Sequence, residues 1–115
     1  MNLRIVFPLL ITLSASVSLD AATRGWKVAA VKVSSIESNR PEMRGENAVD
    51  GNEATRWASE FTDPQWIQLD LGEPRTVSEV TIEWEAAYAR RYQVSISSDA
   101  LKWQTVFTEE QGDGG

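Results

Sequence analysis

The chain has 115 residues and a formal net charge of −6, and it contains no His and no Cys. This length is typical of a single domain. The acidic balance disfavours nucleic acid and anionic membranes as partners, because both attract basic surfaces. Without His and Cys, the chain cannot build a Ser-His or Cys-His nucleophile, a disulfide or a His-ligated zinc site.

Residues 1–22 have the layout of a secretory signal peptide. Arg4 lies in a short positive head, an apolar run extends from Ile5 to Val17, and small residues follow at 18, 21 and 22. This run is too short to span a bilayer, and no cysteine is available for a lipid anchor. The sequence therefore predicts removal of residues 1–22 and secretion of residues 23–115. The alternative is that the apolar run is a buried N-terminal strand or helix.

The chain after residue 26 is predicted to form short strands separated by polar loops. The expected strands are residues 26–33, 66–71, 77–85, 92–97 and 103–108. The pattern is clearest in residues 66–71, where Ile67, Leu69 and Leu71 alternate with Trp66, Gln68 and Asp70. Strands of this kind, joined by turns without helices between them, indicate an all-β antiparallel sandwich or barrel.

Five Trp residues in a chain of this size indicate a core built around large aromatic side chains. We expect Trp57, Trp66, Trp84 and Trp103 to be buried, because each occupies a predicted strand or turn position. Residues 34–46 are polar and contain a proline and a glycine, so they are predicted to form a long loop.

Residues 47–57, with the sequence NAVDGNEATRW, form a tight turn that is rich in oxygen atoms. Asp50, Asn52 and Thr55 surround Gly51, which allows a sharp backbone path. Carboxylate, amide and hydroxyl oxygens are the ligands that Ca²⁺ prefers. A bound metal is also a common stabilising device in a small domain without disulfides. We therefore favour a calcium site over the alternative, an ordinary Asp-Gly turn with local hydrogen bonds.

Four segments, in order along the chain, resemble the coagulation factor V/VIII type C domain, also called the discoidin domain. Bacterial relatives of that domain include the family 32 carbohydrate-binding modules. The segments are NAVDGNEATRW (47–57), DPQWIQLDLG (63–72), VSEVTIEWEAAYARRYQVSIS (77–97) and SDALKWQTV (98–106). The resemblance implies a galactose-binding-like jelly-roll β-sandwich over residues 23–115, which binds ligands through loops at one end.

The resemblance also implies a structural Ca²⁺ near the oxygen-rich turn. Its ligands would be the Asn47 carbonyl, the Asp50 carboxylate, the Asn52 carbonyl, and the carbonyl and hydroxyl of Thr55. The family's pattern continues beyond this point with final strands and a Glu that completes the metal site. The resemblance therefore predicts a sandwich lacking roughly its last two strands, with unpaired strand edges, weaker calcium binding and marginal stability.

A smaller departure from the family lies in the turn at residues 98–101. The family usually has Asp-Gly where this chain has Asp99 followed by Ala100. Because alanine tolerates a positive φ poorly, we expect a different type of turn here.

Candidate ligand-binding residues lie in loops. Phe61 stands in a polar loop, where its ring could stack on a sugar, and Glu60 could accept hydrogen bonds from sugar hydroxyls. Tyr88 and Arg90 flank the loop after the 77–85 strand, and Arg90 offers a forked donor to hydroxyls or to a carboxylate. The alternatives are a hydrophobic cap over the core edge for Phe61 and solvated surface for the others.

These observations favour a secreted, non-catalytic carbohydrate-binding module that takes a glycan or polysaccharide and contains a structural calcium. One alternative is an adhesion or scaffolding module that binds protein or lipid, and another is the N-terminal appendage of a larger glycoside hydrolase. Glu83 and Glu85 share a strand face and invite comparison with a two-carboxylate glycosidase. The sequence suggests no acid–base partner or enclosing pocket for them, so we do not expect an enzyme.

Overall fold

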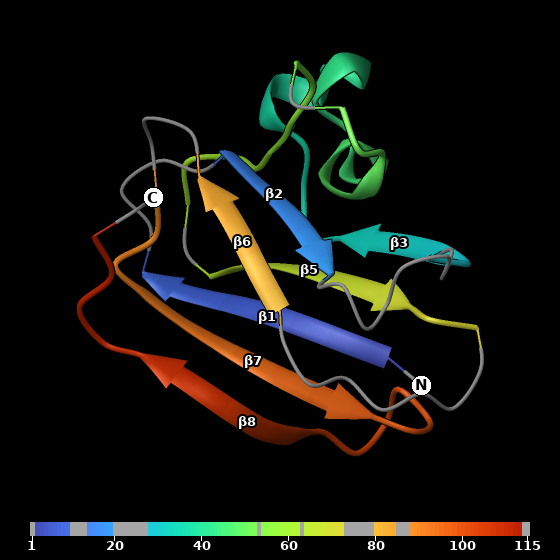
Figure 1. Cartoon of the computed structure of the whole chain (residues 1–115). Coiled ribbons are helices and arrows are strands. Elements are labelled where there is room, and N and C mark those ends of the chain that lie inside the picture. The colour runs from blue at the N-terminus through green and yellow to red at the C-terminus, as the bar shows by residue number, and fades with distance from the viewer. Residues whose placement is uncertain are drawn as a thin grey trace.

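The computed structural model describes residues 2–9, 14–19, 28–52, 54–62, 64–72, 80–84 and 88–113, and its strands form two antiparallel sheets (Figure 1). The strands are β1 (Asn2–Leu9), β2 (Ser14–Leu19), β3 (Ala30–Val33), β4 (Trp57–Ala58), β5 (Gln65–Asp70), β6 (Val80–Trp84), β7 (Arg91–Ser97) and β8 (Gln104–Glu109). The larger sheet has the order β3-β5-β1-β7-β8, and the smaller has the order β4-β2-β6. This arrangement confirms the predicted all-β sandwich.

The core lies between the two sheets and is centred on β5. Alternation along β5 directs Ile67 and Leu69 inward, where both are fully buried, as is Leu71 directly after the strand. Trp57 from β4 is buried against them, and Val94 contributes from β7. Full burial of a side chain of this kind contributes about 1.5–3 kcal/mol relative to its exposure. These few residues therefore supply much of the free energy that holds the sheets together.

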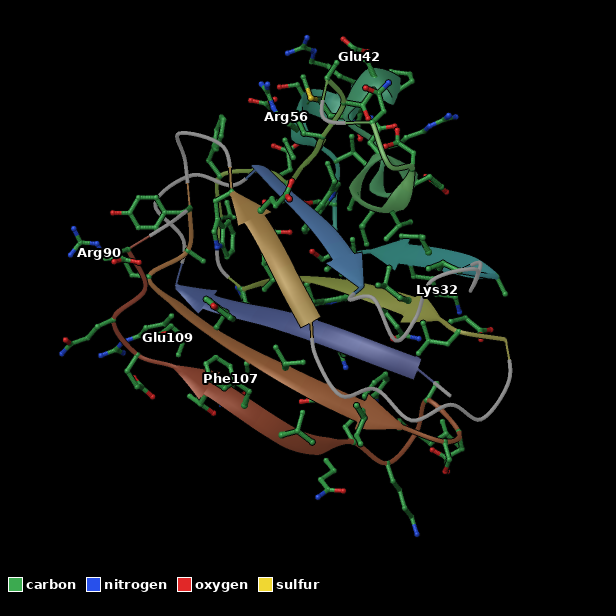
Figure 2. The ribbon with its side chains drawn as sticks, viewed as in Figure 1. Lys32, Glu42, Arg56, Arg90, Phe107 and Glu109 are labelled. Carbon is green, nitrogen blue, oxygen red and sulfur yellow. The ribbon has the colours of Figure 1, made fainter. Side chains whose placement is uncertain are left out.

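An aromatic row extends from the smaller sheet to the outermost strand of the larger one. Trp84 packs against Tyr92 with ring centroids 5.6 Å apart, and Tyr92 packs against Phe107 at 6.1 Å. Trp84 and Tyr92 are half-buried beside the core, whereas Phe107 and its neighbour Val106 are about half exposed. On β8, therefore, the row reaches a part of the larger sheet that is only partly covered (Figure 2).

Two of the four Trp residues expected in the core lie elsewhere. Trp66 is out of phase with the buried Ile67, so it lies on the outer face of the larger sheet and is half-buried. Trp103, directly before β8, is also half-buried. It lies near Trp66, since the guanidinium of Arg4 stacks over both rings. The expectation of burial in the core is thus confirmed for Trp57, holds in part for Trp84, and is wrong for Trp66 and Trp103.

The N-terminal segment occupies interior positions in both sheets. β1 lies between β5 and β7, and β2 lies between β4 and β6. The resemblance predicted unpaired strand edges without locating them; in the structure, β1 pairs with β5 and β7, and β2 pairs with β4 and β6. This placement corresponds to the alternative interpretation of the apolar run as a buried strand. Removal of residues 1–22 as a signal peptide stays a prediction.

The polar segment before the oxygen-rich turn is more regular than predicted. It contains two short 3₁₀ helices, η2 (Glu37–Asn39) and η3 (Pro41–Met43), and a third, η4 (Gly45–Val49), begins in it and extends into the oxygen-rich turn (Figure 1). Runs of this length are too short to give a hydrophobic period, so the sequence signals only a loop. No helix among the described residues is long and apolar enough to cross a membrane.

The turn between β7 and β8 keeps a left-handed residue. Ala100 has a φ of 62°, so this alanine does adopt the positive φ that it was expected to avoid. The Ser97 hydroxyl accepts hydrogen bonds from the backbone N–H groups of Asp99 and Ala100, at 3.2 and 2.9 Å. The Asp99 carboxylate accepts from the N–H groups of Leu101 and Lys102, at 2.9 and 3.0 Å. These bonds hold Ala100 in a conformation that alanine alone disfavours.

Candidate functional site

The two loops that carry the candidate ligand-binding residues leave the sandwich at the same end. Trp57 of β4 and Trp84 of β6 are both register partners of Ala15 on β2. Because β4 and β6 are both antiparallel to β2, they run in the same direction. β4 and β6 therefore end on the same side of the smaller sheet, about 10 Å apart at two strand spacings, with the described residues 59–62 directly after β4 and the described residues 88–90 directly before β7 (Figure 1).

All four predicted ligand-binding residues are at least partly accessible. Phe61 is 61% exposed and Arg90 is exposed, with its side chain directed away from the sandwich (Figure 2), while Tyr88 is half-buried. The Arg90 carbonyl accepts a hydrogen bond from the backbone N–H of Gly112 at 2.7 Å. The C-terminal segment thus fixes the backbone at Arg90 while the guanidinium stays available to a ligand.

Glu60, the fourth predicted ligand-binding residue, already has a structural partner. Its Oε1 accepts a hydrogen bond from the backbone N–H of Ser38 at 2.8 Å, and its own N–H donates to the Ser35 hydroxyl at 3.0 Å. Ser38 has a positive φ of 49°, which this bond helps to hold. Glu60 therefore connects the 3₁₀ region to the Phe61 loop, and its use as an acceptor for sugar hydroxyls would compete with this role.

A buried amide that the sequence analysis missed supports the loop that carries Phe61. Gln65, 4% exposed, accepts hydrogen bonds at Oε1 from the hydroxyls of Ser34 and Ser35, at 2.5 and 2.6 Å. Its Nε2 donates to the Thr62 carbonyl at 2.9 Å. These bonds connect the base of the Phe61 loop to Ser34 and Ser35 and to Thr62 within the loop, so Phe61 extends from a hydrogen-bonded base. Gln65 begins an alternating strand in phase with Ile67, and that phase was the available signal of its burial.

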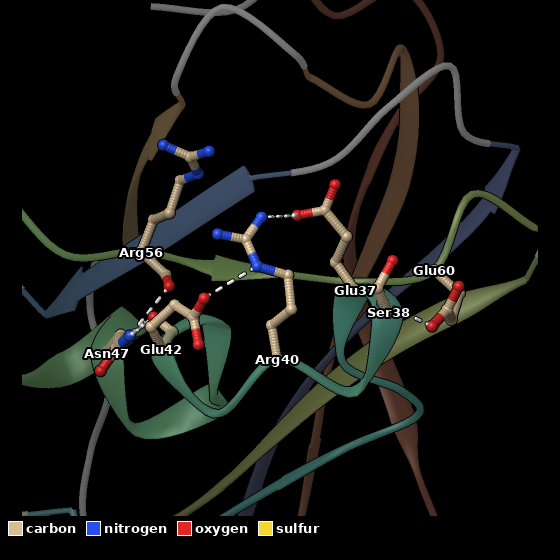
Figure 3. A network of polar contacts seen from close by, with 7 residues as sticks. All are labelled: Glu37, Ser38, Arg40, Glu42, Asn47, Arg56 and Glu60. Carbon is tan, nitrogen blue, oxygen red and sulfur yellow. Dashed lines mark hydrogen bonds and ion pairs between the residues drawn. The ribbon is translucent and has the colours of Figure 1, made fainter.

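Polar contacts also fix the 3₁₀ region beside the candidate metal site (Figure 3). Arg40 contacts Glu37 at 3.8 Å and Glu42 at 2.8 Å, and these exposed pairs contribute little free energy. The stronger element is Asn47, which is 7% exposed and donates from Nδ2 to the carbonyls of Glu42 and Arg56, at 2.6 and 3.0 Å. The Asn47 amide is therefore structural, and a role in metal binding would fall to its main-chain carbonyl.

The predicted calcium ligands in the oxygen-rich turn converge. The Thr55 hydroxyl lies 2.5 Å from Asp50 Oδ2 and 3.0 Å from the Asn52 carbonyl oxygen. Asp50 Oδ1 accepts from the backbone N–H of Asn52 at 2.8 Å. The Thr55 hydroxyl first, and then this N–H, lower the pKa of Asp50 below its usual range. An ionised carboxylate, a hydroxyl and a carbonyl that meet at one point are a donor set that fits a hard cation.

The described residues show no larger acidic metal cluster and give no support to a two-carboxylate catalytic site. No group of three or more His, Cys, Asp or Glu side chains lies close enough to hold a metal within the described ranges. Glu83 is exposed on β6, and Glu85 lies outside the described residues. Among the described residues of this turn, the candidate ligands are one carboxylate together with carbonyl and hydroxyl oxygens, which suit calcium better than a transition metal.

The chain was compared with known protein families. The family model of the NedA-like galactose-binding domain, of the F5/F8 type C class, matches residues 47–115. The chain belongs to this family. The matched range includes the oxygen-rich turn and both loops of the candidate ligand-binding end, so the resemblance drawn from the four sequence segments is confirmed.

A relative of this F5/F8 type C chain is the "Polysaccharide lyase 8 family protein HylA" of Enterococcus faecalis, with 40% identity over 75 residues. The aligned part is 65% of this chain but only 5% of that protein, so the chain corresponds to a small part of the relative's length. No solved structure shows a significant match.

Proposed function

We propose that the chain is a non-catalytic carbohydrate-binding module that binds a glycan or polysaccharide with the loop residues 59–62 and 88–90. The observation that carries this proposal is the galactose-binding family match, which spans both loops. The exposure of Phe61 and Arg90 at the same end of the sandwich supports it. The relative named as a polysaccharide lyase supports polysaccharide as the ligand class.

Binding would combine stacking with directed hydrogen bonds. The Phe61 ring offers an apolar face to the C–H face of a sugar ring, and the hydrogen-bonded base beneath it limits the entropy lost on binding. The Arg90 guanidinium would donate to paired hydroxyls, or bidentately to the carboxylate of an acidic sugar. Tyr88 would border the sugar, while Glu60 would act mainly by holding the Phe61 loop in place.

Affinity electrophoresis in gels that contain neutral or uronate-bearing polysaccharide tests this proposal. Phe61→Ala should weaken the affinity, measured from gel retention, by about tenfold or more, because loss of a stacking aromatic removes a principal contact. The matched control is Leu101→Ala, another exposed apolar residue, which lies at the opposite end of β7 and should change nothing. Unaltered retention of Phe61→Ala, or no retention of the folded parent chain in any polysaccharide, contradicts the proposal.

We further propose that Asp50, Asn52 and Thr55, with the Asn47 carbonyl, hold a structural Ca²⁺. Because the ion would bind only the folded chain, calcium should raise the melting temperature relative to chelator. Asp50→Asn removes the one carboxylate of the set and should abolish this rise. Asp99→Asn is the matched control, since Asp99 also accepts backbone hydrogen bonds in an exposed turn but lies outside the set. A calcium-induced rise that persists in Asp50→Asn would disprove the assignment.

We also propose that residues 1–22 direct the chain to secretion, and that the module serves as an appendage of a larger polysaccharide-active protein. Secretion is supported by the order of positive head, apolar run and small residues in the sequence. The role of an appendage is supported by the relative, in which the matched region is only 5% of the whole protein. Binding of lipid through Phe61 is the competing use of the same loop. Co-sedimentation with anionic vesicles, without binding to any polysaccharide, would favour that use instead.

A further inference from the structure

The N-terminal strand β1 is held on both of its sides. Residues 2–7 pair with β5, from Asn2 opposite Asp70 to Phe7 opposite Gln65. On the other side Asn2 pairs with Ser97, and the register continues as far as Leu9 opposite Arg91, with one irregularity after Val6. β5 and β7 therefore make no ladder with each other and depend on β1 for the hydrogen bonds on their facing edges.

Arg4 gives β1 a specific side-chain contact with the rest of the sheet. Its guanidinium carbon lies 4.8 Å from the ring centroid of Trp66 and 5.5 Å from that of Trp103, so two aromatic rings stack on one cation. The Nε of Arg4 is buried and has no hydrogen-bond partner among the described residues. The cation thus contacts two rings, one from β5 and one from the residue preceding β8.

We propose that the space between β5 and β7 is an acceptor site for an extended peptide, selective for an arginine that enters between Trp66 and Trp103. In the full chain residues 2–9 are this peptide, supplied in cis. The inference rests on strand pairing alone and requires neither glycan binding nor export.

We expect a peptide to bind between β5 and β7 because an empty space there would cost free energy. Without β1, the facing backbone groups of β5 and β7 would lose their partners in the middle of a sheet, beside the buried side chains of Ile67, Leu69 and Val94. A strand that satisfies these groups gains affinity from main-chain hydrogen bonds, and its side chains confer specificity. A cut in the chain after Ala22 should therefore leave the N-terminal peptide bound, and only another strand should displace it.

Disulfide trapping in the full chain tests the placement. The chain has no native cysteine, so each double variant contains a single possible pair. Asn2→Cys with Asp70→Cys, and Asn2→Cys with Ser97→Cys, should both oxidise readily, because directly opposed residues lie within disulfide reach. Asn2→Cys with Gln104→Cys is the control, one strand further away. Failure of the first two pairs, or equal oxidation of all three, overturns the placement.

Peptide exchange tests the selectivity. A protease site inserted between Ala22 and Thr23 of the full chain allows cleavage after folding. Fragment 1–22 should then co-elute with the remainder, and a labelled peptide of the same sequence should exchange into the complex. The Arg4→Ala peptide should compete about tenfold more weakly, and Arg4→Lys should recover part of the loss. Release of the fragment on cleavage with no change in the far-ultraviolet spectrum, or equal competition by both peptides, disproves the proposal whatever the glycan experiments show.

Discussion

Ala100 has a strained backbone conformation, and a single substitution can relieve the strain. Its φ of 62° is unfavourable for a residue with a Cβ atom by about 1–2 kcal/mol. Ala100→Gly removes this strain but adds freedom to the unfolded chain, so the net gain in the free energy of unfolding should be about 0.5–1 kcal/mol. Urea denaturation measures it. Ala54→Gly is the control, because Ala54 is not among the described residues with positive φ, and it should be neutral or destabilising.

Asp99 makes stability depend on pH in the acid range. Its carboxylate accepts hydrogen bonds from the N–H groups of Lys102 and Leu101 and from the Ser97 hydroxyl, and these lower its pKa. A lowered folded-state pKa means that the contribution is present above the unfolded value, about 3.9, and is lost as pH falls through the folded value. The stability difference between the parent chain and Asp99→Asn should therefore be constant near neutral pH and shrink below about pH 4. A difference that grows on acidification contradicts this assignment.

Single residues also show where sequence reasoning ends. Alternation along residues 66–71 correctly assigned Ile67 and Leu69 to the core, and the same alternation placed Trp66 on the other face. The preference of large aromatics for burial was then applied to Trp66 against its phase, and it was wrong. Glu60 illustrates another limit, because its main partner, the N–H of Ser38, lies 22 positions away and is a backbone group that no side-chain pattern reveals.

At the level of elements, the 3₁₀ helix η4 packs against β3 at a point where no side chain fits. A Cβ on Gly45 would lie 2.6 Å from Val33 Cγ1 and 3.0 Å from Val31 Cγ1. Gly45→Ala should therefore lower the free energy of unfolding by about 1–3 kcal/mol, as overpacking does. Denaturant titration measures the loss. Val33→Ala makes room for the new methyl group, so the double variant should be more stable than the sum of the single effects predicts. Strict additivity would show that the contact does not carry the cost.

Longer elements with a repeating pattern of apolar residues were predicted from the sequence, and shorter ones were not. β5, β6, β7 and β8 were predicted within a few residues, because apolar side chains alternate along β5, β6 and β7, and β8 is a short run of β-branched and aromatic residues bounded by polar turns. β4 has two residues and the 3₁₀ helices have three to five, so none of them repeats a pattern often enough to be recognised. β1 was not predicted as a strand for a different reason: an apolar run that follows a positive charge and precedes small residues favours a signal peptide, and a buried strand or helix was only the alternative.

At the scale of the whole molecule, the antiparallel sandwich and the grouping of functional loops come from topology. The sequence identified Phe61 and Arg90 as loop residues but could not bring their loops together. That required the register, in which β2 separates β4 and β6 and both strands point the same way. The oxygen-rich turn precedes β4 whereas the Phe61 loop follows it, so the candidate metal and sugar sites lie at opposite ends of one short strand.

The outermost strand β8 determines how the molecule behaves at high concentration. Its free edge carries Val106 and Phe107, each about half exposed, and the strand ends in its one charged residue, Glu109. Such an edge can pair with the same edge of another molecule. The net charge of −6 opposes that encounter near neutral pH, and the opposition vanishes near the isoelectric point of about 4.6. Colloidal stability therefore depends on the net charge of the protein rather than on charged residues along β8. We expect the protein to precipitate in mildly acidic buffers.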